Sequence, residues 1–348
     1  MKRILLFIVL ALILLAGFVS WMVIGPATAF SAKTYALLIP TGSTYDNVLA
    51  KLKEDQVISN PAIFNLVAKQ LDYPEKVKAG RYLIQNGNSL VTIVRKLRNG
   101  QQDPVNLVIT KLRTKEDFAA LTGKKFEFDS ASFLQFLNNN DSLAKYNLDT
   151  NTIMTGVLPD TYTYFWNTTP SRVMEKILKN NQVFWTADRL ALAKSKGLSS
   201  QQVVILASII EEETNKKEDK GNIASVYINR MRKGMKLGAD PTVKFALREF
   251  GLKRIYNKHL AVESPYNTYR VSGLPPGPIC TPQRETIDAV LLAPETNYIF
   301  FVAKADFSGS SVFAETYEQH LLYAKAYQQA LDNYLKAKNI PEDTATKP

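Results

Sequence analysis

The stretch from Ser199 to Thr214 reads Ser-Ser-Gln-Gln-Val-Val-Ile-Leu-Ala-Ser-Ile-Ile-Glu-Glu-Glu-Thr, and it decides the fold of the second half of this chain. Ser199 followed three residues later by Gln202 is a capping-box pattern, which predicts that a helix begins there. From Val203 to Ile210 the residues are apolar except for one serine. A helix that is apolar nearly all round is a buried helix.

Three glutamates follow this apolar run at once, at positions 211–213. Successive helical residues differ by about 100°, so the three side chains point in different directions and at least one faces the interior. Glu211 is on the same helix face as Ala207, four residues earlier, whereas Glu213 is on the same face as Ile210, three residues earlier. Periodicity alone therefore does not choose between Glu211 and Glu213.

A carboxyl group in apolar surroundings has a raised pKa, because desolvation penalises its charged form. A carboxylic acid that is still protonated near neutral pH is what general acid catalysis on a glycosidic oxygen requires. The alternative interpretation is a solvated helix end, or a glutamate paired with Arg230 or Arg232.

The N-terminus carries an uncharged apolar run from Ile4 to Ile24, preceded by Lys2 and Arg3. Its 21 residues span about 31 Å as a helix, enough for a bilayer core. The positive flank predicts a cytoplasmic N-terminus, and Trp21 lies near the far interface. Ala27 to Ala29 offers the cleavage site of a signal peptide as a rival, but the length of the run favours an anchor. Either way, we expect the body to lie outside the cytoplasm.

The composition of the 348 residues, 46% hydrophobic and 22% charged, is that of a globular chain with two or three domains. A single cysteine, Cys280, excludes a disulfide framework and a cysteine-based zinc site. His259 and His320 are too few for a histidine-rich metal centre, so we predict no metal and no cofactor.

The net charge of +11 is spread along the chain and suggests an anionic partner. Nucleic acid is excluded by the predicted location and by the lack of basic–aromatic interleaving.

A small unit is predicted directly after the apolar run. It has strands over 36–40 and 80–84, helices over 43–52 and 61–70 between them, and a further helix over 89–98. This strand–helix–helix–strand order, with the stretch Lys78 to Tyr82, resembles a LysM module of the kind that binds glycans containing N-acetylglucosamine. The alternative is a plain spacer domain.

The stretch from Ala207 to Thr214 resembles the signature of the YceG-like (MltG) family of endolytic murein transglycosylases. The weakest match is Gly309 to Phe313, where the family usually has Gly-Gly-His-x-Phe. Six further blocks resemble the family in order: Gly156–Tyr162, Ala224–Arg230, Gly234–Leu237, Asp240–Val243, Tyr266–Tyr269 and Gly273–Ile279.

The resemblance implies a lyase that cleaves the β-1,4 bond between N-acetylmuramic acid and N-acetylglucosamine within peptidoglycan strands and leaves a 1,6-anhydro end. The catalytic glutamate of the family is the first in the signature, which falls on Glu211. Glu213 and Ser208 are then expected to support it. The residues expected to bind substrate are Asn229, Arg230, Asp240, Thr242, Tyr266, Asn267, Thr268, Tyr269 and Pro276.

Two of these stretches have structural alternatives. Asp240 before Pro241 is also typical of an Asx-type helix cap, and the alternation from Tyr266 to Tyr269 is also typical of an ordinary strand. The stretch Gly273 to Pro278 cannot continue a helix or a central strand, which predicts a stiff loop.

The fold class predicted is α+β, with a transmembrane helix, a small LysM-like domain and a larger α+β catalytic domain. We expect a single-pass protein of the cell membrane whose partners are glycan strands and peptidoglycan polymerases. A non-catalytic scaffold that binds peptidoglycan is the competing function. The predicted boundaries are 1–25 for the cytoplasmic tip and anchor, 26–35 for a linker, 36–102 for the LysM-like domain, 103–338 for the catalytic domain and 339–348 for a disordered tail.

Overall fold

The structure, a computed structural model, describes residues 2–337. The described chain divides into two compact units. The first holds the residues up to 107 together with 122–129 and 163–170, and the second holds the rest. Helices predominate, and the described strands pair into three two-stranded sheets. The expected mixture of helix and sheet is confirmed, and the tail predicted at 339–348 lies outside the described residues.

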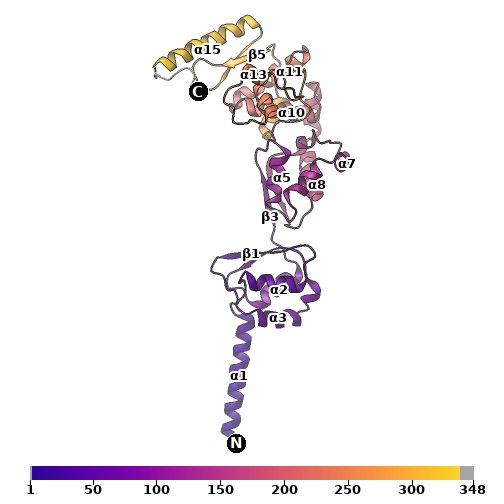
Figure 1. Cartoon of the computed structure of the whole chain (residues 1–348), viewed down its shortest axis with the longest axis vertical. Coiled ribbons are helices and arrows are strands. Elements are labelled where there is room, and N and C mark those ends of the chain that lie inside the picture. The colour runs from indigo at the N-terminus through magenta and orange to yellow at the C-terminus, as the bar shows by residue number, and fades with distance from the viewer. Residues whose placement is uncertain (1, 338–348) are drawn as a thin grey trace. The chain divides into compact units, whose positions relative to one another are not determined.

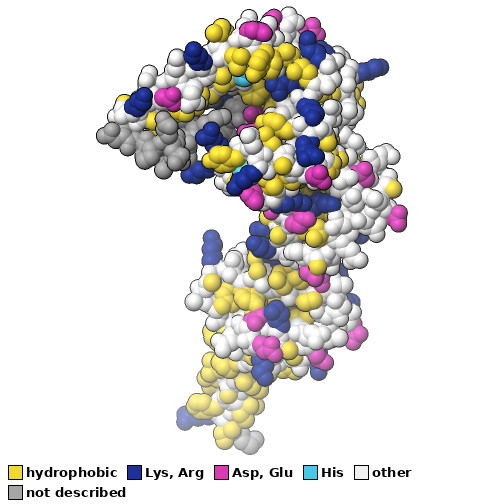
Figure 2. Space-filling view, turned by 45° about the horizontal axis from the view of Figure 1, so that its top comes forward, with side chains coloured by type: hydrophobic (Ala, Val, Ile, Leu, Met, Phe, Trp, Pro, Cys, Tyr) yellow, Lys and Arg dark blue, Asp and Glu magenta, His cyan; other side chains and the backbone are white. Residues whose placement is uncertain are grey.

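The apolar N-terminal run forms helix α1 (Lys2–Ile24), as expected. Its side chains from Ile4 onward are largely exposed, and hydrophobic atoms cover this part of the chain (Figure 2). Within the described residues it is the one helix long and apolar enough to cross a membrane. Exposed apolar surface of this extent suggests a single-pass membrane anchor.

The small unit has the predicted strand–helix–helix–strand order (Figure 1). Strands β1 and β2 pair antiparallel, and Leu37 lies opposite Tyr82. The helix predicted over 43–52 begins at Tyr45 instead, because Thr44 caps it in a reciprocal capping box with Asn47. The elements are β1 (Thr34–Ile39), α2 (Tyr45–Glu54), α3 (Pro61–Gln70), the 3₁₀ turn η1 (Pro74–Lys76), β2 (Gly80–Gln85) and α4 (Leu90–Asn99).

The segment predicted as a linker, residues 26–35, differs from that expectation. Ala27 is buried in the core of the small unit, and Thr28 forms a β-bridge with Ile58. The Ala29 amide donates to the carbonyl of Val57 at 3.1 Å. The chain therefore joins the small unit directly after α1, since these backbone groups need partners once they leave water.

The remaining elements build the larger unit and the connections to it. Its core lies around α10, whose residues Val203 to Ile210 are all buried and belong, apart from Ile205 and Ser208, to one hydrophobic cluster. The elements are β3 (Val105–Ile109), α5 (Lys115–Gly123), α6 (Ser130–Leu137), α7 (Asn140–Ala144), η2 (Ile153–Gly156), β4 (Asp160–Tyr164), α8 (Pro170–Phe184), α9 (Ala187–Ser195), α10 (Ser200–Glu213), α11 (Lys217–Arg232), α12 (Asp240–Leu247), α13 (Asn257–Leu260), α14 (Arg284–Leu291), β5 (Phe300–Ala303), β6 (Ser311–Ala314) and α15 (Tyr317–Ala337).

Helix α10 forms as the sequence predicts. Ser199 accepts a hydrogen bond from the Gln202 amide, and the Gln202 side chain caps the Ser199 amide in return. The helix ends with Glu213, the last of the three glutamates. Its apolar body is held in the core, so its acidic end has a fixed position against the neighbouring helices.

Candidate active site

Glu211 is held in a buried ion pair. Its Oε2 atom lies 2.9 Å from Lys220 Nζ on α11 and also accepts a hydrogen bond from the hydroxyl of Thr286 on α14. Lys220 Nζ in turn donates to Thr286 Oγ1 at 2.6 Å. The side chains of Glu211 and Lys220 are only 10% and 11% exposed. This triad joins three helices, and a buried charge needs such partners.

Glu212 points toward a different pair of cations. Its carboxylate lies 2.9 Å from Lys111 Nζ and 3.0 Å from Arg113 Nη2. Burial on its own raises the pKa of Glu212, but the hydrogen bonds and charges of Lys111 and Arg113 outweigh it and lower the pKa. Glu212 is therefore a carboxylate that fastens the segment before α5 to the end of α10.

Glu213 faces a third set of residues. Its negative charge lies near Tyr227 and Arg230 of α11 and near Tyr269, and it favours the protonated form of each of them. Two of these, Arg230 and Tyr269, are among the residues expected to bind substrate. The structure thus groups these two predicted binding residues with Glu213.

Arg230 is fixed by the backbone around it. Its Nε donates to the carbonyl of Ile299 at 2.7 Å, and its Nη1 donates to the carbonyl of Leu237 at 2.5 Å. Its guanidinium also lies 5.5 Å from the ring centroid of Phe300. Burial lowers the pKa of Arg230. Tyr227, Tyr269 and Glu213 act to raise it, but burial has the larger effect. An arginine held in this way presents a positioned positive charge beside Glu213.

Asp240 and Tyr269 form the polar pair next to Arg230. The Tyr269 hydroxyl donates to Asp240 Oδ1 at 2.6 Å, and burial together with this hydrogen bond raises the pKa of Tyr269. The interpretation of Asp240 as an Asx-type cap is wrong, because Ala239 is the cap residue of α12 and no side chain caps that end. The carboxylate of Asp240 orients Tyr269 instead.

Three of the predicted substrate-binding residues are completely buried, namely Thr242, Asn267 and Thr268. The hydroxyls of Thr242 and Thr268 lie 2.8 Å apart, and Thr268 Oγ1 accepts from the Ala239 amide at 2.9 Å. Asn267 Nδ2 donates to the carbonyl of Leu260 at the end of α13 and to that of Val262. These polar groups bond within the chain, which favours a role in holding the start of α12.

Tyr266 and its neighbours lie in turns, so the strand interpretation of Tyr266 to Tyr269 is wrong. The Tyr266 ring packs on Phe245 with centroids 4.7 Å apart, and burial raises the pKa of its hydroxyl. The turns arise because Asn267 Oδ1 accepts from the Tyr269 amide two residues on, which is an Asx-turn.

The proline-rich segment from Gly273 to Pro278 is an irregular loop, as predicted. Ser208 of α10 anchors its end, because Ser208 Oγ accepts from the Ile279 amide at 3.0 Å. A side chain at Gly277 would collide with the carbonyl of Asn151. Pro276 in this loop is partly exposed, whereas its neighbour Pro275 is buried. Ser208 thus supports the loop from the helix that carries the glutamates.

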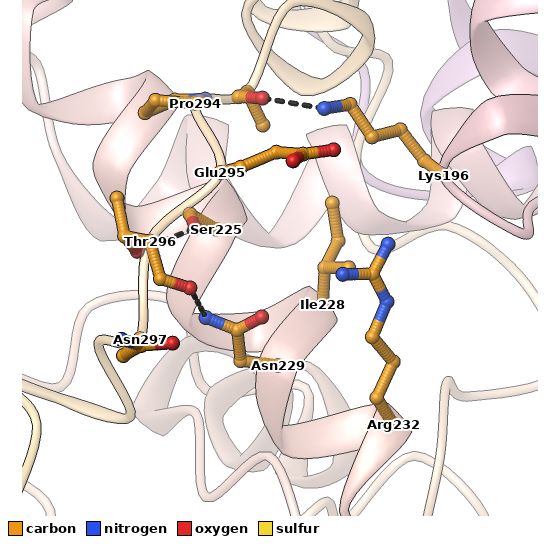
Figure 3. A pocket seen from close by; sticks show the side chains of 10 residues that line it. Lys196, Ser225, Ile228, Asn229, Arg232, Pro294, Glu295, Thr296 and Asn297 are labelled. Carbon is orange, nitrogen blue, oxygen red and sulfur yellow. Dashed lines mark hydrogen bonds between the residues drawn. The ribbon is translucent and has the colours of Figure 1, made fainter.

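Asn229 faces away from this group of residues. Its Nδ2 donates to the carbonyls of Thr296 and Tyr298 at 2.7 and 3.0 Å, and its side chain lines a cavity of about 350 Å³ (Figure 3). None of the three glutamates is among the residues that line this cavity. The structure therefore separates Asn229 from Arg230, its neighbour in the sequence.

The segment that departs from the family pattern, Gly309 to Phe313, is held without a histidine. The Ser311 amide donates to Asp219 Oδ2 of α11 at 2.6 Å. Phe313 stacks on Tyr298 with centroids 5.5 Å apart. Its backbone is thus tied to the helix that carries Lys220 and Arg230.

Sequence reasoning did not identify the partners of the first two glutamates. Lys220 follows Glu211 by nine positions, and Thr286 and Arg113 lie far away along the chain, so no local pattern connects them. Tyr227 had a usable signal, because it lies inside the block Ala224 to Arg230.

The buried helix with an acidic end, facing arginine and tyrosine from the neighbouring segments, is the centre of a fold with known members. The YceG-like family matches residues 37–326, and the chain belongs to that family. An endolytic murein transglycosylase of Bacillus subtilis (strain 168) is 28% identical over 330 residues, which cover 90% of this chain and 88% of the relative.

Two further comparisons agree with this family. An endolytic murein transglycosylase of Streptococcus pneumoniae (strain ATCC BAA-255 / R6) is 27% identical over 335 residues, which cover 85% of this chain and 58% of the longer relative. The crystal structure of a putative yceG-like protein of Listeria monocytogenes matches with a TM-score of 0.55 and 28% identity, and covers 83% of this chain and 98% of that one.

Proposed function

We propose that this protein is a membrane-anchored endolytic murein transglycosylase, a lyase that cuts within peptidoglycan strands. The observation that carries the proposal is the group formed by Glu213, Arg230, Tyr269 and Asp240 at the end of α10. Membership in the YceG-like family and relatives named for this activity support the same conclusion.

The reaction needs one carboxyl group that acts twice. The glutamic acid donates its proton to the glycosidic oxygen while the bond from that oxygen to C1 of the N-acetylmuramic acid breaks. The carboxylate then takes the proton of the 6-hydroxyl of the same sugar as that oxygen bonds to C1. The products are a 1,6-anhydro end and a free 4-hydroxyl on N-acetylglucosamine. The substrate supplies the nucleophile, so proximity is built into it and no water is consumed.

We propose Glu211 as this acid, as the resemblance to the family implies, and Glu213 is the alternative. The bonds from Lys220 and Thr286 hold the carboxyl group of Glu211 in a fixed position. Glu213 lies with Arg230 and Tyr269, which have the chemistry to hold a sugar or its N-acetyl group. Both assignments are open to a direct test with paired glutamine variants.

The proposed setting is the outer face of the cell membrane. Lys2 and Arg3 at the start of α1 favour a cytoplasmic N-terminus, and the joining of α1 directly to the small unit keeps that unit near the bilayer. Peptidoglycan polymerases are the proposed partners, since a strand cut near the membrane is one that has just been made. The activity would then end strand elongation.

The small unit is proposed to bind glycan as a LysM-like module. Support comes from its strand–helix–helix–strand order and its antiparallel β1–β2 pair. Binding of N-acetylglucosamine oligosaccharides to the full chain, measured by titration, tests this part independently of cleavage. The absence of saturable binding would leave the small unit as a spacer.

The test of the activity is mass spectrometry of the soluble products after purified glycan strands are incubated with the full chain in detergent. We expect fragments with 1,6-anhydro ends. Products with reducing ends would mean hydrolysis, which needs a second carboxylate or base to activate water. Strand binding without any product would favour the second candidate, a peptidoglycan-binding scaffold, which the altered Gly309 to Phe313 segment supports.

A further inference from the structure

The polar cavity beside Asn229 in the larger unit is not used by the proposed reaction (Figure 3). Its volume is about 350 Å³, within the range of pockets that hold small ligands. Lys196 enters it from the end of α9 and Arg232 from the end of α11. Pro294 to Asn297, between α14 and β5, form the opposite wall.

Charges of both signs line this cavity. Lys196 donates one hydrogen bond, to the carbonyl of Ala293 at 2.6 Å, and an ammonium has three donors. Arg232 and Glu295 are exposed, and neither makes an ion pair with the described part of the chain. The cavity thus offers two cations and one anion that are available to a ligand.

Asn229 adds a hydrogen-bond acceptor to the lining of the cavity. Both donors of its amide are directed at backbone carbonyls, those of Thr296 and Tyr298, so its Oδ1 is left to accept. Figure 3 draws this oxygen on the side of Ile228 and Arg232. An ammonium bound between Glu295 and Asn229 would find acceptors on both sides.

We propose that this cavity binds the peptide stem of the murein substrate, a short peptide that carries free carboxylates and a free ammonium group. Arg232 pairs with a carboxylate through two parallel hydrogen bonds, and Lys196 contributes a second positive charge. Glu295 and Asn229 accept from the ammonium. A simple phosphate fits less well, because the Glu295 carboxylate repels it. This assignment rests on the proposed function and adds the peptide to the substrate that function implies.

The cavity is connected to the Glu213 group through one segment. Asn229 bonds the carbonyls of Thr296 and Tyr298, while Arg230 bonds the carbonyl of Ile299. Two consecutive residues of α11 therefore hold the same short stretch, one from the cavity and one from the Glu213 group. A glycan at Glu213 and a stem in the cavity would be held by the same piece of backbone.

The test measures binding of three probes to the full chain in detergent by calorimetric titration. The probes are a soluble disaccharide with its peptide stem, the same disaccharide without the peptide, and inorganic phosphate. The variants are the double change Lys196→Gln with Arg232→Gln and the control Lys233→Gln, an exposed lysine next to Arg232 that does not line the cavity.

We expect the wild type and the control to bind the peptide-bearing probe more tightly than the bare disaccharide. The double variant should lose about tenfold or more of that affinity, which is about 1.4 kcal/mol, while its cleavage of strands stripped of peptide stays unchanged. Equal binding of the peptide probe by the double variant and the wild type would overturn the assignment. Phosphate bound as tightly as the peptide probe would also overturn it.

Failure of this proposal is distinguishable from failure of the proposed function, because binding is read without cleavage. A chain that binds the peptide probe as expected but yields no anhydro products keeps the stem site and loses the transglycosylase. A chain that produces anhydro ends but does not distinguish the two disaccharides loses only the stem site.

Discussion

Glu211 and Glu213 stand two residues apart at the end of one helix, yet their surroundings differ in kind. Glu211 lies between α10, α11 and α14, where an ammonium and a hydroxyl satisfy its carboxylate. Glu213 lies near Arg230 and Tyr269. Arg230 is held by a hydrogen bond to the carbonyl of Ile299, and Tyr269 by one to Asp240. The difference teaches that a run of identical acids is not a run of identical roles. The helix fixes their directions, and distant segments then decide what each one meets.

Removing the cation from the Glu211 side should have the largest effect on stability. Lys220→Met keeps the length of the side chain but leaves the Glu211 carboxylate buried without its ammonium, which costs about 3–5 kcal/mol. Denaturant unfolding of the full chain in detergent measures it. The double change Lys220→Met with Glu211→Gln should recover part of the loss, and a double variant no more stable than Lys220→Met alone would refute the ion pair as the cause.

Glu212 sharpens the comparison through pH. Its pKa is lowered in the folded chain by Lys111 and Arg113, so its stabilising contribution is present above its unfolded pKa of about 4.3 and is lost as the pH falls through the lower folded value. Glu212→Gln should cost about 1–3 kcal/mol at pH 7. The gap between variant and wild type should close on acidification below about pH 4. A gap that is constant with pH would contradict an electrostatic origin.

Tyr269→Phe should have the smallest effect on stability. It removes one hydrogen bond to Asp240, and a single hydrogen bond contributes about 1 kcal/mol. The thermal midpoint of the variant, followed by circular dichroism, should therefore fall by a few degrees only. A loss as large as that of Lys220→Met would mean that the Glu213 side is a structural core like the Glu211 side, and the contrast between them would disappear.

Most of the local structure was predictable from the sequence. The capping box at Ser199, the apolar body of α10 and the proline at the start of α3 are local signals, and each element formed where its signal lies. The segment from Tyr266 to Tyr269 was less clear, because alternating aromatic and polar residues fit a strand as well as turns. The segment forms turns because the Asn267 side chain accepts a hydrogen bond from the Tyr269 amide.

The site was predictable only in part. The blocks that contain Arg230, Asp240 and Tyr269 were identifiable, and the structure brings these three residues together. The partners of Glu211 were not predictable, because the contacts with Lys220 and Thr286 depend on how three helices pack. The prediction of a linker at 26–35 was wrong for the same reason. The backbone hydrogen bonds from Ala29 to Val57 and from Ser59 to Ala27 depend on tertiary packing, which composition does not reveal.

The most direct test of the central claim compares Glu211→Gln with Glu213→Gln in the same strand-cleavage assay, with the unfolding free energy of both measured alongside. The account predicts that Glu211→Gln loses about 10²–10⁴-fold in the rate at which anhydro ends appear per folded molecule. Glu213→Gln should keep most of its rate per folded molecule. A Glu211→Gln variant that remains active, beside an inactive Glu213→Gln variant, would contradict the account and move the acid to Glu213.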